Sequence, residues 1–447
     1  QPEMSMESVF SLADEYTGEK IGSKLERIRE IMKENGCNAH ILSSLDDIAW
    51  LLNIRGNDIA YCPLVLSYAI VYNNSVELFA DIRKFSDDII NLLAENQVKI
   101  YPYEDIYRKV SEMTSEDKLL LDSAIMNYSL YQAISKETVI VDKQNPEILM
   151  KSVKNETQAE NLRKAHLKDA VAHTKFMYWL KKNIGRVEIT ELSASARLEG
   201  LRAEQEHFLG PSFGPISAYG EHGAIVHYSA DEKSNVPLKE GKLFMTDTGG
   251  HYLEGSTDIT RTVALGEVGN IEKEHYTMVA RAMLLLANTV FLYGCSGANL
   301  DCIAREVFWK EGLNFNHGTG HGVGYLLNIH EGPINFRWKE GERPAPALEE
   351  NMVITDEPGI YIEGSHGIRL ENELLVRKTV KNEYGQFMNF EILTYVPIDL
   401  DAILPEKMST EEKEMLNHYH KQVYEKVSPY LSEEERIWLK EYTRAVK

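Results

Sequence analysis

The sequence predicts a mixed α/β (α+β) chain with two domains and a helical C-terminal extension. At 447 residues the chain is longer than a domain with a single hydrophobic core usually is. Strand, helix and hairpin patterns mix in the first part, whereas residues 210–400 hold short β segments separated by many glycines. A charged helical tail follows. We therefore predict domains over residues 1–150 and 151–398, and an extension over 399–447 that packs on the second domain.

The first domain is expected to open with a helix. Ser23 and Glu26 form a candidate capping box, and Gly36 ends the helical pattern. NAHILSS then predicts a strand, and the apolar segments LVLSYAIVY and SVELFADI flank Asn73-Asn74 as the arms of a β-hairpin. No cluster of catalytic residue types stands out in this sequence region.

A long helix is expected to open the second domain, where the charged stretch 151–169 offers Asn155 or Thr157 as a cap. The apolar residues that follow at helical spacing are Leu162, Ala165, Ala172, Phe176 and Trp179.

Charge and composition exclude several classes of partner. The formal net charge of -21 repels nucleic-acid phosphates. No apolar run approaches the roughly 20 residues of a membrane span, and the first residues, QPEMSMESVF, carry no secretory signal pattern. The four cysteines form no CxxC motif, which fits free thiols in a reducing compartment. We expect a cytoplasmic protein that binds neither nucleic acid nor membrane.

Five acidic or imidazole side chains in the second half form a candidate metal site. Each lies in a segment marked by glycine or proline: FMTDTGG, GSTDITRT, HGTGHGVG, TDEPGIY and GIRLENE. The five residues are Asp247, Asp258, His321, Glu357 and Glu371. Four carboxylates and one imidazole suit a pair of hard divalent cations. If the five converge, the chain is a dinuclear metal hydrolase, in which two cations activate a shared water.

Each acidic segment can also be interpreted separately, from its own residues. Asp247 and Asp258 could face each other across a hairpin, and two like charges so close are costly unless a cation lies between them. Two unrelated surface aspartates explain this pair alone equally well. GIRLENELLV alternates as a strand that places Arg369 and Glu371 on one face. Glu357 precedes a proline, so its backbone is extended, and taken alone it is more often a turn residue.

HGTGHGVG allows three interpretations. His317 and His321 have the i, i+4 spacing of a helical zinc motif, but the interleaved glycines argue against a helix. A phosphate cradle is a weak alternative because no P-loop lysine follows. We prefer a strand or loop that delivers one histidine to a metal. Carboxylate-rich ligation favours two Mn²⁺ ions, with Co²⁺ or Zn²⁺ also compatible, although spacing alone does not fix the metal.

These segments resemble the pita-bread metallopeptidases of family M24, which include methionine aminopeptidase, prolidase and aminopeptidase P. GAIVHYSA, TDTGGHYLEGSTDITRT, HGTGHGVGYLLNIHEGP and DEPGIYIEGSHGIRLENE are similar to the cytosolic, eukaryotic-type long form of the Xaa-Pro aminopeptidases. The similarity continues through LDDIAWLLNIRGND, AHLKDAVAH and the tail, so it covers nearly the whole chain. It implies a creatinase-like N-terminal α/β domain, a pita-bread catalytic domain and a homodimer.

The resemblance also implies which residues hold the metals. Asp258 and Glu371 would bridge the two ions, and Asp247 would chelate one of them. His321 and Glu357 would complete the other. Glu357 would in addition act as the general base.

The same resemblance assigns roles around the metals. His227 and His330 would hydrogen-bond the scissile peptide, and His317 would wall the pocket for the proline ring. Tyr361 and Arg369 would form a network with the chelating aspartate. The implied reaction releases the N-terminal residue from peptides that carry proline in second position.

Two alternatives remain within this resemblance. A prolidase would cut only Xaa-Pro dipeptides, and a non-catalytic relative would serve as a binding module. Non-catalytic relatives and metal-free creatine-type hydrolases are disfavoured because all five ligand positions are filled. Long-form members usually carry two α/β domains before the catalytic one. Only one is expected here, since LADEYTGEKIGSKLERIRE resembles the junction into the second of them.

Overall fold

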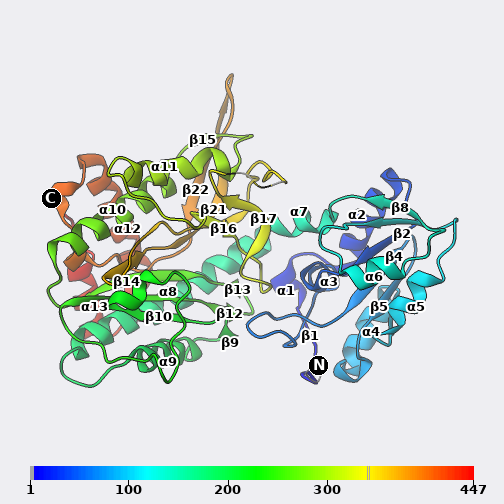
Figure 1. Ribbon diagram of the computed structural model, residues 1–447, viewed down its shortest axis with the longest axis horizontal. Helices are drawn as coiled ribbons and strands as arrows, with labels where there is room; N and C mark the ends of the chain where they lie inside the picture. The colour runs from blue at the N-terminus through cyan, green and yellow to red at the C-terminus, as the bar shows by residue number, and fades with distance from the viewer. Residues whose placement is uncertain (1–4, 340, 342) are drawn as a thin grey trace. The chain divides into compact units, whose positions relative to one another are not determined.

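The computed structural model describes residues 5–339, 341 and 343–447, and the chain forms two compact units (Figure 1). The first unit is Gln1–Gln158 and the second is Ala159–Lys447. Both mix helices with sheets, which confirms the predicted fold class. The predicted division at residues 150 and 398 remains a prediction.

The first unit is built around a six-stranded sheet in the order β6-β5-β4-β2-β7-β8. Its strands are β2 (Ala39–Leu42), β4 (Tyr68–Tyr72), β5 (Val76–Phe79), β6 (Val98–Tyr101), β7 (Lys118–Leu121) and β8 (Val139–Asp142). The antiparallel pair β4–β5 is the predicted hairpin. A two-stranded ribbon joins β1 (Phe10–Ser11) to β3 (Ile54–Arg55). The helices are α1 (Asp14–Thr17), α2 (Ile21–Glu34), α3 (Leu45–Leu51), α4 (Asp87–Glu95), α5 (Asp105–Ser111), α6 (Tyr128–Ala133) and α7 (Pro146–Ser152).

The predicted capping box at Ser23 is wrong. Helix α2 begins at Ile21, and its N-cap residue, Lys20, has no side-chain capping bond. Ser23 already lies in the first turn, and its hydroxyl donates to Glu19 Oε1 at 2.8 Å. The predicted end of the helix is confirmed, because Gly36 follows the C-cap with a positive φ of 67° that a glycine adopts without strain.

The long helix α8 (Glu156–Asn183) is capped by Asn155, one of the two predicted cap residues. The Gln158 backbone N–H donates to Asn155 Oδ1 at 2.9 Å, and the Asn155 N–H donates to Gln158 Oε1 at 3.1 Å. These reciprocal bonds satisfy two donors that the first turn would otherwise leave unpaired.

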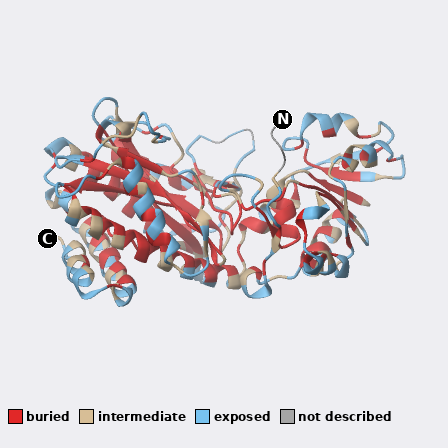
Figure 2. Ribbon diagram, turned by 90° about the horizontal axis from the view of Figure 1, so that it is seen from below, coloured by how far each residue is buried: buried red, intermediate tan, exposed pale blue. Residues whose placement is uncertain are grey.

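The second unit combines α8 with antiparallel sheets. A six-stranded sheet runs in the order β15-β22-β21-β18-β16-β17, beside smaller sheets β10-β11-β14, β13-β12-β9 and β19-β20. The strands are β9 (Phe208–Pro211), β10 (Ile216–Tyr219), β11 (Lys242–Thr248), β12 (Gly250–Tyr252), β13 (Gly255–Ser256), β14 (Ile259–Leu265), β15 (Phe291–Leu292), β16 (Gly320–Gly322), β17 (Glu331–Phe336), β18 (Val353–Asp356), β19 (Gly359–Ile362), β20 (His366–Arg369), β21 (Asn372–Asn382) and β22 (Gly385–Ile392). The remaining helices are α9 (Glu191–Ala203), α10 (Asn270–Ala287), α11 (Gly297–Trp309), α12 (Thr410–Val427) and α13 (Glu433–Tyr442). Figure 2 shows the strands as the buried layer, while exposed residues gather on helix faces and loops.

The helical tail packs on the rest of the second unit through a buried polar contact. Tyr419 of α12 accepts a hydrogen bond from Arg261 of β14 at 2.7 Å and donates to the Val396 carbonyl at 2.6 Å. The other arm of the Arg261 guanidinium donates to the Glu371 carbonyl at 2.6 Å. The tail therefore helps to fix the backbone at one predicted metal ligand.

The structure corrects two strand predictions near the site. Asp247 of β11 pairs with Thr260 of β14, so Asp258 lies just before its strand and not directly opposite Asp247. GIRLENELLV is two strands, because β20 ends at Arg369 and β21 begins at Asn372. At the break the Glu371 N–H donates to the Thr260 carbonyl at 3.1 Å, which draws this segment to β14.

Candidate dinuclear metal centre

Six strands from three sheets, together with their ends, deliver the five predicted ligands to one cavity of about 380 Å³. Asp247 lies near the end of β11, Asp258 precedes β14, His321 is central in β16, Glu357 follows β18, and Glu371 connects β20 to β21. The same cavity is lined by His227, His317, His330 and Arg369. The structure therefore brings together residues that are separated by more than a hundred positions in the sequence.

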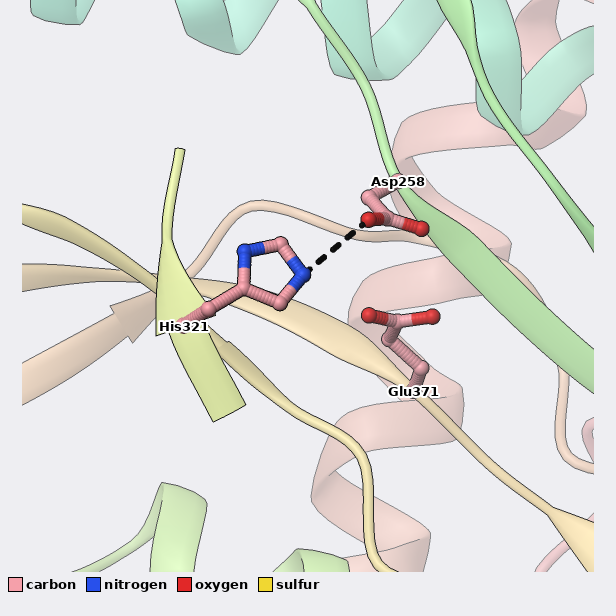
Figure 3. A group of neighbouring side chains, drawn as sticks. All are labelled: Asp258, His321 and Glu371. Carbon is pink, nitrogen blue, oxygen red and sulfur yellow. Dashed lines mark ion pairs between the residues drawn. The ribbon is translucent and has the colours of Figure 1, made fainter. Parts of the chain in front are cut away.

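Three of the ligands form the tightest group. Asp258, His321 and Glu371 each offer one ligand atom, and these atoms all lie within 4.8 Å of one another. Figure 3 shows the imidazole of His321 pointing at the two carboxylates from a different strand. His321 Nε2 lies 3.5 Å from Asp258 Oδ2 and 3.6 Å from Glu357 Oε1. Asp247 lines the cavity beside this group.

The local structure orients the His321 ring toward the carboxylates. Its Nδ1 lies 2.9 Å from the Gly322 carbonyl, so this nitrogen carries the proton and donates. The Nε2 lone pair is thereby turned toward the carboxylates, as in metal-bound histidines. Gly320 allows this placement, because a Cβ there would lie 1.8 Å from the Thr355 carbonyl of the adjacent β18. The glycines of HGTGHGVG thus serve close strand packing, and the predicted non-helical reading is confirmed.

The electrostatics favour bound cations. Asp258 and Glu371 are 4% and 1% exposed. Burial raises the pKa of the Asp258 carboxyl well above its usual value, and the Asp247 and Glu357 carboxylates add to the rise. Burial and then Asp258 raise the pKa of Glu371 in the same direction. Within the described residues, buried Asp247 Oδ1 has no hydrogen-bond partner. This donor set fits two hard divalent cations, which would relieve the repulsion.

Hydroxyl groups that the sequence analysis missed hold two of the carboxylates. The Thr260 hydroxyl donates to Glu371 Oε2 at 2.7 Å, and the Thr355 hydroxyl donates to Glu357 Oε1 at 3.1 Å. Strand alternation offered a signal, since Thr260 follows Asp258 by two positions and Thr355 precedes Glu357 by two.

A buried pair behind Asp258 was also missed. Glu373 Oε1 accepts the Asp258 backbone N–H at 2.6 Å. Glu373 Oε2 lies 3.1 Å from His166 Nε2, at ion-pair distance but without hydrogen-bond alignment. Both side chains are fully buried. The contact joins β21 to α8 and fixes the start of β14, a long-range arrangement that short motifs do not encode.

The predicted network around Arg369 is present. One arm of its guanidinium pairs with the Asp247 carboxylate, and the other donates to the Tyr361 hydroxyl at 2.7 Å. The Tyr361 hydroxyl in turn lies 2.8 Å from His317 Nε2, while His317 Nδ1 lies 2.7 Å from the Gly318 carbonyl. Burial raises the pKa of Tyr361 to about 12. Burial and then Arg369 lower the pKa of His317 to about 4. Tyr361 therefore donates to a neutral His317.

The open side of the cavity carries the two remaining histidines. His227 and His330 are exposed, and the His330 ring centroid lies 4.4 Å from that of His321. Burial of the ring nitrogens and the adjacent His321 lower the pKa of His330 to about 4, so near neutral pH it is an uncharged imidazole with one N–H to donate. Phe213, Ile216 and Val226 give the cavity an apolar wall.

Comparison with known proteins decides the family. Residues 1–158 match the creatinase/prolidase N-terminal domain, residues 160–378 match metallopeptidase family M24, and residues 386–446 match the C-terminal region of that peptidase family. Xaa-Pro aminopeptidase 1 of Dictyostelium discoideum is 36% identical over 96% of this chain and 69% of its own length. Aminopeptidase P1 of Arabidopsis thaliana is 34% identical over 100% and 77%. The chain belongs to the Xaa-Pro aminopeptidases of metallopeptidase family M24.

Solved structures of the family agree with this assignment. The X-prolyl aminopeptidase from Caenorhabditis elegans, described as a cytosolic enzyme with a di-nuclear active site, superimposes with a TM-score of 0.93 at 33% identity. The match covers 100% of this chain and 74% of that one. The Xaa-Pro dipeptidase from Bacillus anthracis gives a TM-score of 0.67 at 25% identity over 85% of this chain. The predicted creatinase-type N-terminal domain and pita-bread catalytic domain are thereby confirmed.

Among the described residues, no helix has both the length and the apolar character needed to cross a bilayer.

Proposed function

We propose that this chain is a dinuclear-metal Xaa-Pro aminopeptidase that removes the N-terminal residue from peptides with proline in second position. The observation that carries the proposal is the convergence of four carboxylates and His321 on one cavity that also has an apolar wall. Membership of the Xaa-Pro aminopeptidase family supports the same reaction. We propose Asp247, Asp258, His321, Glu357 and Glu371 as the residues that would hold the two metals.

Glu357 is proposed as the general base. When bound, the two cations would polarise the scissile carbonyl and lower the pKa of the attacking water. Glu357 lies at the cavity with one oxygen held by Thr355. Burial raises the pKa of its carboxyl, while His321 and Arg369 oppose that rise. Such a carboxylate can take a proton from water and deliver it to the leaving proline nitrogen.

The histidines at the opening are proposed to hold the scissile peptide. His227 and His330 line the cavity and can donate hydrogen bonds to the carbonyl oxygen as negative charge develops on it. The Arg369 guanidinium pairs with the Asp247 carboxylate and donates to the Tyr361 hydroxyl. That hydroxyl also contacts His317, so the three contacts hold His317 in a fixed position relative to Asp247. These contacts orient the pocket before substrate arrives.

The apolar wall is proposed to receive the proline ring. A Xaa-Pro bond is a tertiary amide without an N–H, so binding cannot rely on a backbone donor at that residue. Phe213, Ile216, Val226 and the neutral face of His317 offer ring contacts instead.

We further propose Mn²⁺ as the native metal, a homodimer as the assembly and the cytoplasm as the location. The oxygen-rich ligand set supports Mn²⁺, with Co²⁺ or Zn²⁺ compatible. Family resemblance supports the dimer. The free cysteines and the description of the Caenorhabditis elegans relative as cytosolic support the location.

The test is hydrolysis of Arg-Pro-Pro by the purified chain with added Mn²⁺, monitored by release of free arginine. We expect turnover that falls sharply in Glu357→Gln and is unchanged in the control Lys421→Ala, whose exposed side chain lies on α12. The likeness to a dipeptidase raises a prolidase as the second candidate. Cleavage of Arg-Pro without cleavage of Arg-Pro-Pro would favour the prolidase. Absence of turnover on both would overturn the proposed reaction.

A further inference from the structure

A buried ion pair between two helices contacts the backbone beside two of the proposed metal ligands. Its members are Asp169 of α8 and Arg202 of α9, which are 0% and 3% exposed. Arg202 Nε donates to Asp169 Oδ1 at 2.6 Å, and a terminal guanidinium nitrogen donates to Asp169 Oδ2 at 3.2 Å. Such paired N–H donors hold a carboxylate in one geometry. We call these two residues the buried pair, and neither of them lines the metal cavity.

One end of the buried pair holds the backbone just after Asp247. The terminal nitrogen of Arg202 that contacts Asp169 also donates to the Thr248 carbonyl at 3.2 Å. Thr248 is the last residue of β11 and follows Asp247 directly. Arg202 therefore fixes the end of the strand that carries this ligand.

The other end of the buried pair holds the residue just before Asp258. The Thr257 hydroxyl donates to the Asp169 carboxylate and accepts the Gly250 backbone N–H at 2.9 Å. The Ser212 hydroxyl donates to the Thr257 carbonyl at 2.8 Å. Thr257 is thus held through both its side chain and its backbone, which sets the direction in which the chain enters Asp258.

The strand ladder alone does not fix Asp258. The last paired residues of β11 and β14 are Thr248 and Ile259, so Asp258 lies one residue beyond the ladder. Between these two strands the chain runs through β12 and β13, which belong to another sheet. The segments nevertheless touch, because a Cβ on Gly249 would lie 1.8 Å from the Thr257 carbonyl. Contacts outside the ladder must therefore set the position of Asp258 relative to β11.

Two cations that share an activated water lie about 3.5–4 Å apart, so their ligands must be held at matching positions. We propose that the buried pair holds Asp247 and Asp258 at the separation that two bound cations require. Asp169 and Arg202 are then positioning residues, which act on the metals only through the backbone of the two ligands. Because the pair has no net charge, it acts through position rather than through the field at the cavity. This inference rests on the proposed function.

The first test cuts the contact between the buried pair and the backbone. Thr257→Val removes the hydroxyl that reaches Asp169 and keeps the branched shape, whereas Thr257→Ser keeps the hydroxyl. Thr277→Val is the matched control on α10. Thr277 is 1% exposed, and its hydroxyl likewise accepts a backbone N–H at 2.9 Å, from Leu404. Both valine variants therefore leave one N–H without its acceptor, at a similar cost in stability.

Calorimetric titration of Mn²⁺ into the metal-free chains measures affinity, and their thermal unfolding measures stability. Both valine variants should lose stability. Only Thr257→Val should also bind Mn²⁺ more weakly, by about 10- to 100-fold. Thr257→Ser should bind Mn²⁺ with an affinity close to that of the wild type, because it retains the contact with Asp169.

A second test weakens the buried pair itself. Asp169→Asn removes the carboxylate charge and keeps the side-chain shape, and we expect weaker Mn²⁺ binding. Lys181→Met is its control, since it breaks another buried ion pair of α8, with Asp399 at 2.6 Å. This control should lose stability and keep the wild-type Mn²⁺ affinity. If Asp169→Asn does not fold, the comparison of the two Thr257 variants decides.

An equal Mn²⁺ affinity in Thr257→Val and Thr277→Val would overturn the inference, whether both match the wild type or both are weaker. Thr257→Ser binding as weakly as Thr257→Val would overturn it too. A wild type that binds no Mn²⁺ would overturn the proposed metal centre and this inference together. Binding of two ions without hydrolysis of Arg-Pro-Pro would overturn the proposed reaction alone, and the same affinity comparison would still decide the inference.

Discussion

The two units differ in how their buried carboxylates are grouped. In the first unit each buried carboxylate of three ionic contacts has a partner: Lys84 with Asp58, Lys151 with Asp47, and His40 with Glu147. In the second unit four carboxylates line one cavity with Arg369 as the nearby guanidinium. The four carboxylates at one cavity form a concentration of negative charge, which indicates the place where external cations would bind.

The largest effect is expected from Glu357→Gln, which removes the proposed proton acceptor while it keeps the side-chain shape. We predict a fall in kcat of about 10²- to 10⁴-fold. Circular dichroism should remain that of the wild type, because Thr355 can still contact the amide oxygen. Retention of wild-type kcat would remove the assigned role of Glu357.

Breaking a buried ion pair in the first unit should lower the stability of that unit without lowering the rate of catalysis. Lys151→Met leaves Asp47 buried without the cation that lies 2.9 Å away. The expected loss of local stability is about 3–5 kcal/mol, read by hydrogen exchange in the strands of the first unit. Strands of the second unit should keep their protection. Equal loss in both units would show that the comparison between them does not hold.

A third prediction concerns the contact that supports Asp258, a proposed metal ligand. Glu373→Leu removes the acceptor of the Asp258 N–H, and we expect metal affinity to weaken about 10- to 100-fold. Glu373→Gln keeps an acceptor oxygen and should weaken binding less. Titration of metal into the metal-free protein measures both. The same affinity in the leucine variant and the wild type would exclude this positioning role.

The smallest effect is expected at Tyr361. Its hydroxyl connects Arg369 to His317 through bonds of 2.7 and 2.8 Å. Tyr361→Phe should cost about 0.5–1.5 kcal/mol of transition-state stabilisation, or up to roughly tenfold in kcat/KM. The measurement is steady-state hydrolysis of Arg-Pro-Pro, and an unchanged kcat/KM would mean that the network does not order the pocket.

Local features of the fold could be predicted from the sequence, whereas long-range ones could not. The β4–β5 hairpin follows from its turn and flanking apolar segments, and Asn155 caps α8 through a neighbour three positions away. Ser23 failed as a cap because it already lies inside the helix, where its hydroxyl donates to Glu19, which precedes the helix. The strand around Glu371 breaks because its N–H bonds Thr260, a contact that no local pattern contains.

The residues of the candidate site could also be predicted in part from the sequence. The ligand segments stood out through residue type, but their assignment to one centre relied on family resemblance. The structure then placed all five at one cavity. Glu373 was missed because it acts through a contact distant in sequence, to the Asp258 backbone.

The metal content of the purified chain tests the central claim most directly. Elemental analysis after loading with Mn²⁺ and desalting should give two metal ions per wild-type chain, and fewer than two in Glu371→Ala, which lacks a proposed bridging carboxylate. Lys421→Ala should match the wild type. A wild-type chain that binds no metal would contradict the account, because the carboxylates of this cavity would then have no external cation to hold.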